Sequence, residues 1–445
     1  MSEPTALTPS IAGSYLQNLL AGQAGRPLGS LGMLREEAAL RAGMLPLPTT
    51  RNEEWRFTDI SQLVKIPFAP AQSATRLETP DIAQFVIEEA GSRLVFVDGI
   101  YAAQLSMPDS GNGVLVSNLA AAMAKHGAVV EQHLGRHATG AAFINDAYTA
   151  QNTAALIDAA VVIVPRDTAV AAPVHLLFIA TQKEVVSTTR VLVVAEAGSI
   201  VTVLEDYVVH YQPRWQEEAH FTNAVTEISL ADNAHLNHIR VQREGNKAFH
   251  IANCAVSLGR ASNYQSVSVA FGARLSRYNL NVLQAFEGAT CALDGLTLIS
   301  GRQLADTHTC MDHAMPHGTS RQLHKCIVGG SAHAVFNGKV MVRTGAQQTD
   351  AQQSNRNLLL TSKGHIDTKP QLEIFASDVK CTHGATVGQL DPEEVFYLQS
   401  RGLPEAAARN LLTYAFGAEV IDKIPIASLR QQLEQTVLEQ TTGQS

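Results

Sequence analysis

RVLVVAEAGSIVTVLED at residues 190–206, TEISLADNAHLNHIRVQ at 226–242 and CAVSLGRASNYQSVSVAFG at 254–272 share one pattern, and this pattern decides the fold. Each stretch begins with a run of alternating side chains, which is typical of a β-strand with one buried face. A second alternating run follows a short turn of small or polar residues, at Ala197-Gly198, Asp232-Asn233-Ala234 and Gly259-Arg260-Ala261. The pattern predicts a repeated strand–turn–strand unit.

The repeats continue on both sides of these stretches. Short runs rich in β-branched residues extend from about residue 159 to residue 380, and no helix-length segment interrupts them. The lack of intervening helices excludes a sheet built from βαβ units. A large sandwich, a propeller and a β-solenoid are left, and no WD-type or Kelch-type signature is present. Because the repeats are similar in pattern but loose in length, we favour a mainly β solenoid.

Helical patterns flank the repeats. We expect residues 1–90 to be a helical region, with Ser30 as the cap of a helix over residues 31–42, Gly43 just past its end and Pro46 beyond it. Residues 93–98 (RLVFVD) alternate like a strand. The chain therefore divides into an N-terminal helical region at 1–90, a β-solenoid core at 91–390 and a C-terminal helical region at 391–445.

The C-terminal region contains three helix patterns. Asp391 is a cap residue before Pro392, and the first helix ends at Gly402. The second begins at Pro404 and the third near Pro425, each with apolar residues on one face. These residues are Leu412, Phe416 and Val420 in the second helix and Leu429, Leu433 and Val437 in the third. We expect the helices at both ends of the chain to cover the open ends of the solenoid.

The composition limits the partners of the protein. The chain has 445 residues, of which 45% are hydrophobic, and a net charge of −8, so a large core is expected and a basic surface for nucleic acid is not. Five cysteines without a CxxC pair favour a reducing, cytoplasmic compartment. The N-terminal sequence does not have the pattern of a secretory signal. The longest apolar stretch, residues 154–164, is shorter than the ~20 residues of a membrane helix, so we expect no membrane partner.

Cys381 and His383 are the strongest candidates for metal ligands. Residues two apart on an extended strand point to the same side, so the thiol and the imidazole can face one iron. Lys380 is expected to favour the thiolate. Taken alone, these residues are more often a buried packing cysteine and a hydrogen-bonded histidine, because two ligands do not complete a metal site.

A second group of histidines and cysteines lies between residues 308 and 326. Its spacing fits no zinc motif, so metal binding at His308, Cys310 and His313 is the weaker hypothesis. Motifs of catalysis are absent: the chain has no GxSxG nucleophile motif and no GxxxxGK[ST] nucleotide loop. Paired carboxylates of a polysaccharide-cleaving β-helix do not recur at strand spacing either. We therefore expect that the chain is not an enzyme.

Several ordered motifs resemble the SufB/SufD family of iron–sulfur cluster assembly proteins. They cover most of the chain: NEEWRFTD at 52–59, SRQ at 320–322 with Lys325, AVFNGK at 334–339, NLLL at 357–360, KPQLEI at 369–374, DVKCTHGATVG at 378–388 and FYLQSRG at 396–402. SufB-like chains tend to carry an acidic EHEAT-type version of the segment that is CTHGAT here, at residues 381–386. This segment and the length are similar to the SufD branch of the family.

The resemblance implies a right-handed parallel β-helix flanked by helical regions. It further implies a non-catalytic scaffold subunit of a SufBCD complex, which pairs with a SufB-type paralogue and binds a SufC-type ABC ATPase. The segment around Cys381 and His383 would lie at the SufB interface, where the paralogue adds ligands, and His383 is the first choice. A transient iron–sulfur cluster or iron would be shared there with SufB, and no bound cofactor is expected in the isolated chain.

The same resemblance implies that the C-terminal region docks the ATPase. The candidate residues are Phe396, Tyr397, Arg401, Gly402, Leu412, Phe416 and Val420. The alternative is that these apolar faces pack on the solenoid itself. Homodimerisation in the absence of SufB stays open, as do two other functions, a β-helix carbohydrate-active enzyme and a purely structural partner that binds no metal.

Overall fold

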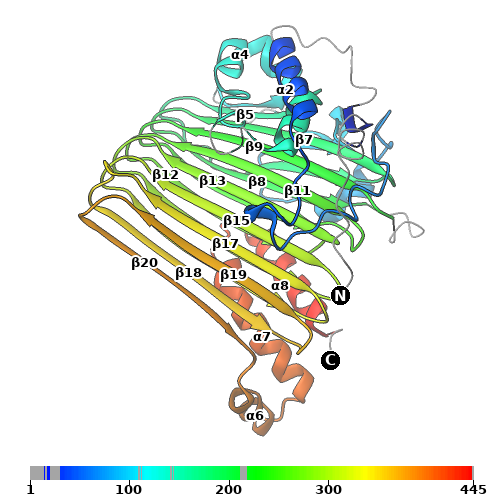
Figure 1. Cartoon of the computed structure of the whole chain (residues 1–445). Coiled ribbons are helices and arrows are strands. Elements are labelled where there is room, and N and C mark those ends of the chain that lie inside the picture. Colours follow the sequence, from blue (N-terminus) through cyan, green and yellow to red (C-terminus); the bar gives the residue numbers. More distant parts are fainter. Residues whose placement is uncertain are drawn as a thin grey trace.

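The computed structural model describes residues 31–108, 113–140, 145–210 and 218–442, together with residues 15, 18–20, 111 and 143. Its strands form two sheets that face each other along one solenoid (Figure 1). Sheet A has the order β19-β17-β15-β13-β11-β9-β7-β5-β4, with β1 paired to β7, and sheet B has the order β20-β18-β16-β14-β12-β10-β8-β6-β2-β3. Consecutive strands alternate between the sheets, and the pairs from β5·β7 to β18·β20 are parallel. The predicted parallel β-solenoid with helical regions near both ends of the chain is confirmed.

The elements have the following bounds. The strands are β1 Ala69–Pro70, β2 Ser92–Val97, β3 Ile100–Tyr101, β4 Leu115–Asn118, β5 Ala160–Val164, β6 Val174–Ala180, β7 Val185–Ala195, β8 Ile200–Val209, β9 Phe221–Leu230, β10 His235–Arg243, β11 Phe249–Leu258, β12 Asn263–Ala270, β13 Leu275–Gln284, β14 Thr290–Ile299, β15 Leu304–His313, β16 Thr319–Val328, β17 His333–Val342, β18 Thr349–Leu359, β19 His365–Ile374 and β20 Val379–Gly388. The helices are α2 Gly32–Met44, η2 Glu53–Trp55, α3 Thr79–Ile82, η3 Ala83–Phe85, η4 Ala103–Leu105, α4 Leu119–His133, α5 Ala147–Ala154, α6 Pro392–Ser400, α7 Glu405–Ile421 and α8 Ala427–Thr442.

The predicted turns stack on one another along the solenoid. Gly198, Asn233 and Ala261 have positive φ angles of 71°, 56° and 50°. The backbone N–H of each donates a hydrogen bond of 2.8–3.0 Å to the corresponding turn one coil further on. The left-handed conformation suits glycine and asparagine and is unfavourable for alanine, so the ladder of turn hydrogen bonds holds Ala261 in it. All three turn predictions are confirmed.

Side chains at equivalent positions of successive coils stack inside the solenoid. Val201, Leu236, Tyr264 and Cys291 are register partners from β8 to β14, and each is at most 1% exposed. Burial of one such apolar side chain contributes ~1.5–3 kcal/mol. A slip of one residue would turn a whole strand's inward set to the outside, so this core fixes the register.

The N-terminal region differs from the prediction in detail. Helix α2 begins at Gly32, Leu31 holds its N-cap position without a side-chain cap, and Gly43 lies inside the helix. Ser30, the predicted cap, lies outside the described residues. Between residues 45 and 91 the chain is mostly irregular, with the short elements β1, α3, η2 and η3, so the expectation of a largely helical segment there was wrong. Helices α4 and α5, which the sequence pattern did not predict, precede the first long run of coils.

Helix α5 lies against the outer face of sheet A. The side-chain amide of Asn152 donates hydrogen bonds of 2.9 Å to the backbone carbonyls of Thr189 in β7 and Asn223 in β9. All residues of α5 are buried, including its polar ones. The helix therefore has no exposed polar face, so its polar residues do not mark a solvent side.

The three C-terminal helices begin close to the predicted positions, and α6 ends as predicted. The Asp391 side chain accepts from the N–H of Glu393 at the start of α6, and Gly402 has a φ of 95° just past its end. Helices α7 and α8 do not cover the end of the solenoid, however. Val420, Leu429 and neighbouring residues pack on outward side chains of β8, β10, β12, β14 and β16, on the outer face of sheet B (Figure 1). The expectation that these helices cap the end was wrong, because the outer face of sheet B is itself apolar and the helices cover it instead.

The last coil, formed by β19 and β20, is uncovered among the described residues. Strands β19 and β20 are the final strands of their sheets, and the residues of β20 are mostly exposed, whereas earlier strands are mostly buried. Ile374, Phe375 and Val387 are 40%, 62% and 49% exposed. Such an edge has free backbone N–H and C=O groups next to apolar surface. Of the helices described, none is long and apolar enough to cross a membrane.

Candidate functional site

Cys381 and His383 lie on β20 at the uncovered end of the solenoid. Their register partners on β18 are Ala351 and Gln353, which are 0% and 3% exposed and point into the solenoid. Since side chains in register in a parallel pair point to the same face, Cys381 and His383 both face the open interior of the last coil. The prediction that they share one side of an extended strand is confirmed.

Cys381 is half-buried and packs against the last small apolar cluster, which includes Val340, Ala351 and Leu372. Burial raises the pKa of its thiol above the usual value. Lys380 points to the opposite face of β20, so the expectation that it would favour the thiolate was wrong for the isolated chain. A metal ion or a cationic group from another chain would have to supply that effect.

His383 is exposed, and no other side chain within the described ranges holds it by a hydrogen bond or ion pair. An imidazole without a partner is free to bind a metal ion presented from outside the solenoid. Together the two residues offer one sulfur and one nitrogen ligand, which suits iron but leaves at least two positions unfilled. On their own, the two residues do not complete a metal site.

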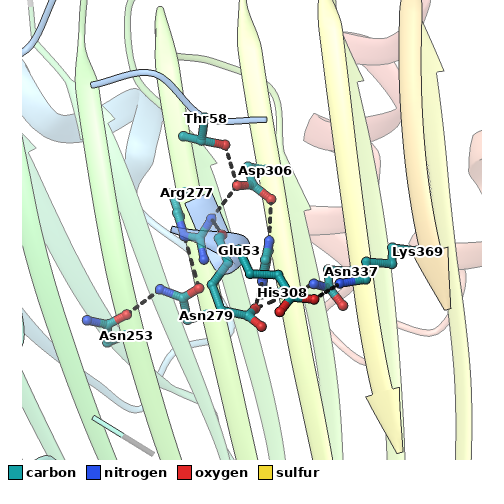
Figure 2. A network of polar contacts seen from close by, with 10 residues as sticks. Glu53, Thr58, Asn253, Arg277, Asn279, Asp306, His308, Asn337 and Lys369 are labelled. Atoms are coloured by element: carbon teal, nitrogen blue, oxygen red, sulfur yellow. Dashed lines mark hydrogen bonds and ion pairs between the residues drawn. The ribbon is translucent and has the colours of Figure 1, made fainter. Parts of the chain in front are cut away.

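A second polar cluster lies on the outer face of sheet A, where the NEEWRFTD segment crosses the strands (Figure 2). The guanidinium of Arg277 stacks over the Trp55 ring at 4.1 Å, donates to the backbone carbonyl of Glu54 at 2.7 Å and to Asp306 Oδ2 at 2.5 Å. The Thr58 hydroxyl also donates to Asp306. These contacts fix the N-terminal segment on β13 and β15, beside a cavity of about 410 Å³.

His308 is held within this cluster by two carboxylates. Its Nδ1 lies 3.1 Å from Glu54 Oε2, and its Nε2 lies 2.9 Å from Asp306 Oδ1. The hydrogen bond from His308 lowers the pKa of Glu54. Burial raises the pKa of Asp306, but the charges of Arg277 and His308 outweigh it and hold that pKa below its usual value. Both ring nitrogens of His308 have partners, so its geometry is that of a structural ion pair.

Cys310 and His313 do not join His308. Cys310 lies on the outer face of β15, where burial raises the pKa of its thiol to about 11. His313 points inward, with its Nδ1 2.6 Å from Gln284 Oε1 and its Nε2 2.9 Å from Ser320 Oγ. Burial lowers the pKa of His313 to about 4. The three residues of this weaker metal hypothesis are not brought to one point.

The residues predicted to dock an ATPase fall into two groups. Phe396 and Tyr397 on α6 are 70% and 57% exposed, and Arg401 stacks over the Tyr397 ring at 5.2 Å. Gly402 follows them in the exposed turn to α7. By contrast, Leu412 and Phe416 are half-buried, and Val420 is buried against sheet B, as the packing alternative expected. The accessible part of this group is α6.

Sequence reasoning missed the partners of His308. Glu54 lies 254 residues away in the chain, and no local spacing connects the two residues. The motif at residues 52–59 combines three acidic residues with two aromatic ones, and this was the available signal. A solenoid brings such distant segments together on its outer face.

Fold and site define a parallel β-solenoid protein with candidate iron ligands at an open end. The family model described as "SUF system FeS cluster assembly, SufBD core domain" matches residues 178–416, and "SufBD protein N-terminal region" matches residues 27–176. The chain belongs to the SufBD family of SUF-system iron–sulfur cluster assembly proteins.

Several curated relatives match over most of their length. The iron–sulfur cluster assembly SufBD family protein of Synechocystis is 43% identical over 413 residues, 91% of this chain and 89% of its own length. The iron–sulfur cluster assembly protein SufD of Escherichia coli is 33% identical over 404 residues, 88% of each chain. Protein ABCI7, chloroplastic, of Arabidopsis thaliana is 32% identical over 410 residues, 90% of this chain and 84% of its own. The predicted resemblance to SufD is confirmed.

Proposed function

We propose that this chain is the SufD-type, non-catalytic scaffold subunit of a SufBCD complex, and that its last coil pairs with a SufB-type paralogue. The observation that carries the proposal is the uncovered end formed by β19 and β20. It combines free strand edges with exposed apolar side chains, and Cys381 and His383 face the same opening. A second solenoid of the same family, added at this end, would cover the apolar surface and add ligands.

The chemistry at this interface concerns iron and sulfide as cargo. His383 is the first-choice ligand, because its imidazole is exposed and neutral imidazole is a suitable, labile iron ligand. Cys381 is second, since burial raises the pKa of its thiol and it also packs against Leu372. The paralogue would supply the remaining ligands, so the cluster is shared and transient.

Helix α6 is the proposed docking element for a SufC-type ATPase. Phe396 and Tyr397 present two large exposed aromatic rings, the residue type that dominates the centre of protein interfaces. Helix α7 continues from α6 and is fixed to sheet B through Val420. A movement of the ATPase at α6 would thus be passed to the solenoid by a packed helix. We expect the double variant Phe396→Ala/Tyr397→Ala to lose the ATPase in a pull-down, whereas Leu438→Ala on α8, also exposed, should retain it.

The experiment for the scaffold function is anaerobic co-purification of the full chain with a SufB-type and a SufC-type partner, with iron and acid-labile sulfide quantified. We expect a stable complex that carries both, and His383→Ala should reduce the iron and sulfide while the subunits still co-purify. His235→Ala is the matched control, because His235 is an exposed histidine on β10. Recovery of the chain without partners would overturn the proposal, and an unchanged cluster content in His383→Ala would remove the histidine from it. Turnover of a polysaccharide by the isolated chain would favour the enzyme alternative.

We also propose that the protein works in a reducing compartment. All five cysteines are free thiols in the structure, which supports a reducing environment such as the cytoplasm. The Arabidopsis relative is named as chloroplastic, so a plastid is the corresponding place in a plant.

A further inference from the structure

A cluster of two histidines and one aspartate lies on the outer face of sheet A, away from the residues assigned above. His333 begins β17, His365 begins β19, and the two are register partners on neighbouring parallel strands. Asp367 follows His365 by two residues and so lies on the same face of β19. The strands place all three side chains together without any contribution from a loop.

Both imidazoles point at the same carboxylate oxygen. Nε2 of His333 is 2.7 Å from Asp367 Oδ2, and Nε2 of His365 is 3.2 Å from it. The two rings are tilted by 58° with centroids 4.8 Å apart, and the three ligand atoms lie within 4.8 Å of one another. Metal–nitrogen and metal–oxygen bonds of ~2.1 Å place neighbouring ligand atoms ~3.0–3.4 Å apart. The distance from His365 to Asp367 lies in this range, and the distance from His333 to Asp367 is that of a hydrogen bond, which an entering ion would replace.

We propose that His333, His365 and Asp367 form a binding site for one divalent transition-metal ion with open coordination positions. Two histidines and one carboxylate on one side of an ion are the ligand set of non-haem Fe²⁺ sites, whereas structural zinc sites are closed by four ligands. His333 and Asp367 are about three-quarters buried, and His365 is 66% exposed. The site is thus held on rigid strands and open to solvent on one side, which suits an ion that is taken up and released.

The same chain provides a contrast at His308. There the two ring nitrogens face two different carboxylates, Glu54 and Asp306, and Asp306 is already paired with Arg277. A cation at that place would meet a guanidinium. At the cluster of His333, His365 and Asp367, no arginine or lysine within the described ranges is ion-paired to Asp367.

The site itself is independent of the proposed function, but its assignment to Fe²⁺ rests on it. Within a scaffold that assembles iron–sulfur clusters, an exposed site of this kind would hold iron before it enters the cluster. The ligand set lacks sulfur, so it would bind the ion reversibly and would not build a cluster itself.

The test uses the untagged full chain, freed of metal by a chelator and titrated anaerobically with Co²⁺ while its visible absorption is recorded. We expect one Co²⁺ to bind at this site in each chain, with micromolar affinity. His333→Ala, His365→Ala and Asp367→Asn should each weaken binding by at least about tenfold, since even outer-shell partners of a metal are worth ~10–100-fold. His235→Ala, which replaces an exposed histidine on β10, should leave this binding unchanged, and circular dichroism should show that every variant is folded.

Two results would overturn the inference. One is the lack of saturable Co²⁺ binding below about millimolar concentration, and the other is an unchanged Co²⁺ affinity in each of the three single variants. Competition with Fe²⁺ then tests the choice of ion. Displacement of Co²⁺ by Fe²⁺ supports it, and failure of Fe²⁺ to compete refutes that assignment while the divalent site stands. Because the titration needs no partner chain, a failure of the SufBCD proposal would appear in co-purification and not here.

Discussion

The ion pair between Arg277 and Asp306 gives the sharpest stability prediction. The two side chains are 3% and 1% exposed, their charged atoms are 2.5 Å apart, and Arg277 also holds the Glu54 carbonyl and the Trp55 ring. Arg277→Met would keep most of the side-chain volume but leave the Asp306 carboxylate buried without its cation. Breaking a buried pair from one side costs ~3–5 kcal/mol. We expect a loss near the lower end of this range, because Thr58 and His308 still contact Asp306.

Denaturation in urea at about pH 7, followed by fluorescence, measures the loss. Arg260→Met is the matched control: Arg260 is paired with Glu287 at 3.7 Å, but both side chains are more than half exposed, so the cost should stay below ~1 kcal/mol. Hydrogen exchange adds a local measurement. In Arg277→Met the amides around Glu54 and Thr58 should lose protection first, since Arg277 connects that segment to β13.

The pH dependence follows from the lowered pKa of Asp306. A carboxyl whose folded pKa lies below its unfolded value of 3.8 stabilises the fold above that value, and the stabilisation is lost as the pH falls through the folded pKa. Without Arg277 the carboxyl becomes easier to protonate, so the penalty of Arg277→Met should be smaller at about pH 5 than at about pH 7. Adding Asp306→Asn to Arg277→Met should recover part of the loss at neutral pH. An Arg277→Met cost below ~1 kcal/mol, equal to that of Arg260→Met, would refute the argument.

Two further substitutions test packing. Gly338→Ala would place a Cβ against Gln353 Nε2 inside the solenoid, so we expect a loss of ~1–3 kcal/mol in urea denaturation. Gly384→Ala on β20 is the control, because a Cβ there meets nothing within 4 Å and the change should be neutral. Equal effects of the two substitutions would contradict the inward packing. Lys325→Met removes a buried ammonium that donates to the Phe416 carbonyl at 2.8 Å and pairs with Glu419. We expect this change to lower the free energy of unfolding by ~1.5–3 kcal/mol and to raise hydrogen exchange in α7. Arg356→Met is the control: it removes a half-exposed partner of the same Glu419 and should lower the free energy of unfolding by less than ~1 kcal/mol. If the amides of α7 stayed as protected from exchange in Lys325→Met as in the unchanged protein, the lysine would not be what holds α7 on sheet B.

The solenoid could be predicted because its signal is local. An alternating run, a turn with a left-handed residue such as Asn233 and another alternating run determine one coil, and each further coil repeats the same short-range information. The shared face of Cys381 and His383 follows from the period of a strand, and the cap at Asp391 from one side chain. These features need no knowledge of distant residues.

Features that depend on distant residues were not predictable. Helix α5 is held by hydrogen bonds from Asn152 to the backbone of β7 and β9, and the sequence of the helix alone does not reveal these contacts. His333 and His365 are one coil apart, and only the register of β17 and β19 makes them neighbours. Helices α7 and α8 lie on sheet B and not on the solenoid end because outward apolar residues such as Ile239 and Leu296 pack against them. These residues appear in the sequence simply as further members of an apolar strand.

The two free edges of the last coil differ, and the difference bears on how a paralogue would bind. Strand β19 contains Pro370, which pairs in register with Gly338 of β17 and has no N–H to donate. Proline in a sheet is tolerated where its missing N–H points away from the neighbouring strand, so the free edge of β19 lacks a donor in its middle. Strand β20 has no proline and carries Cys381 and His383. If a SufB-type solenoid adds a strand to this end, we therefore expect the added strand to pair with β20, next to both candidate ligands, with the edge of β19 left for side-chain contacts.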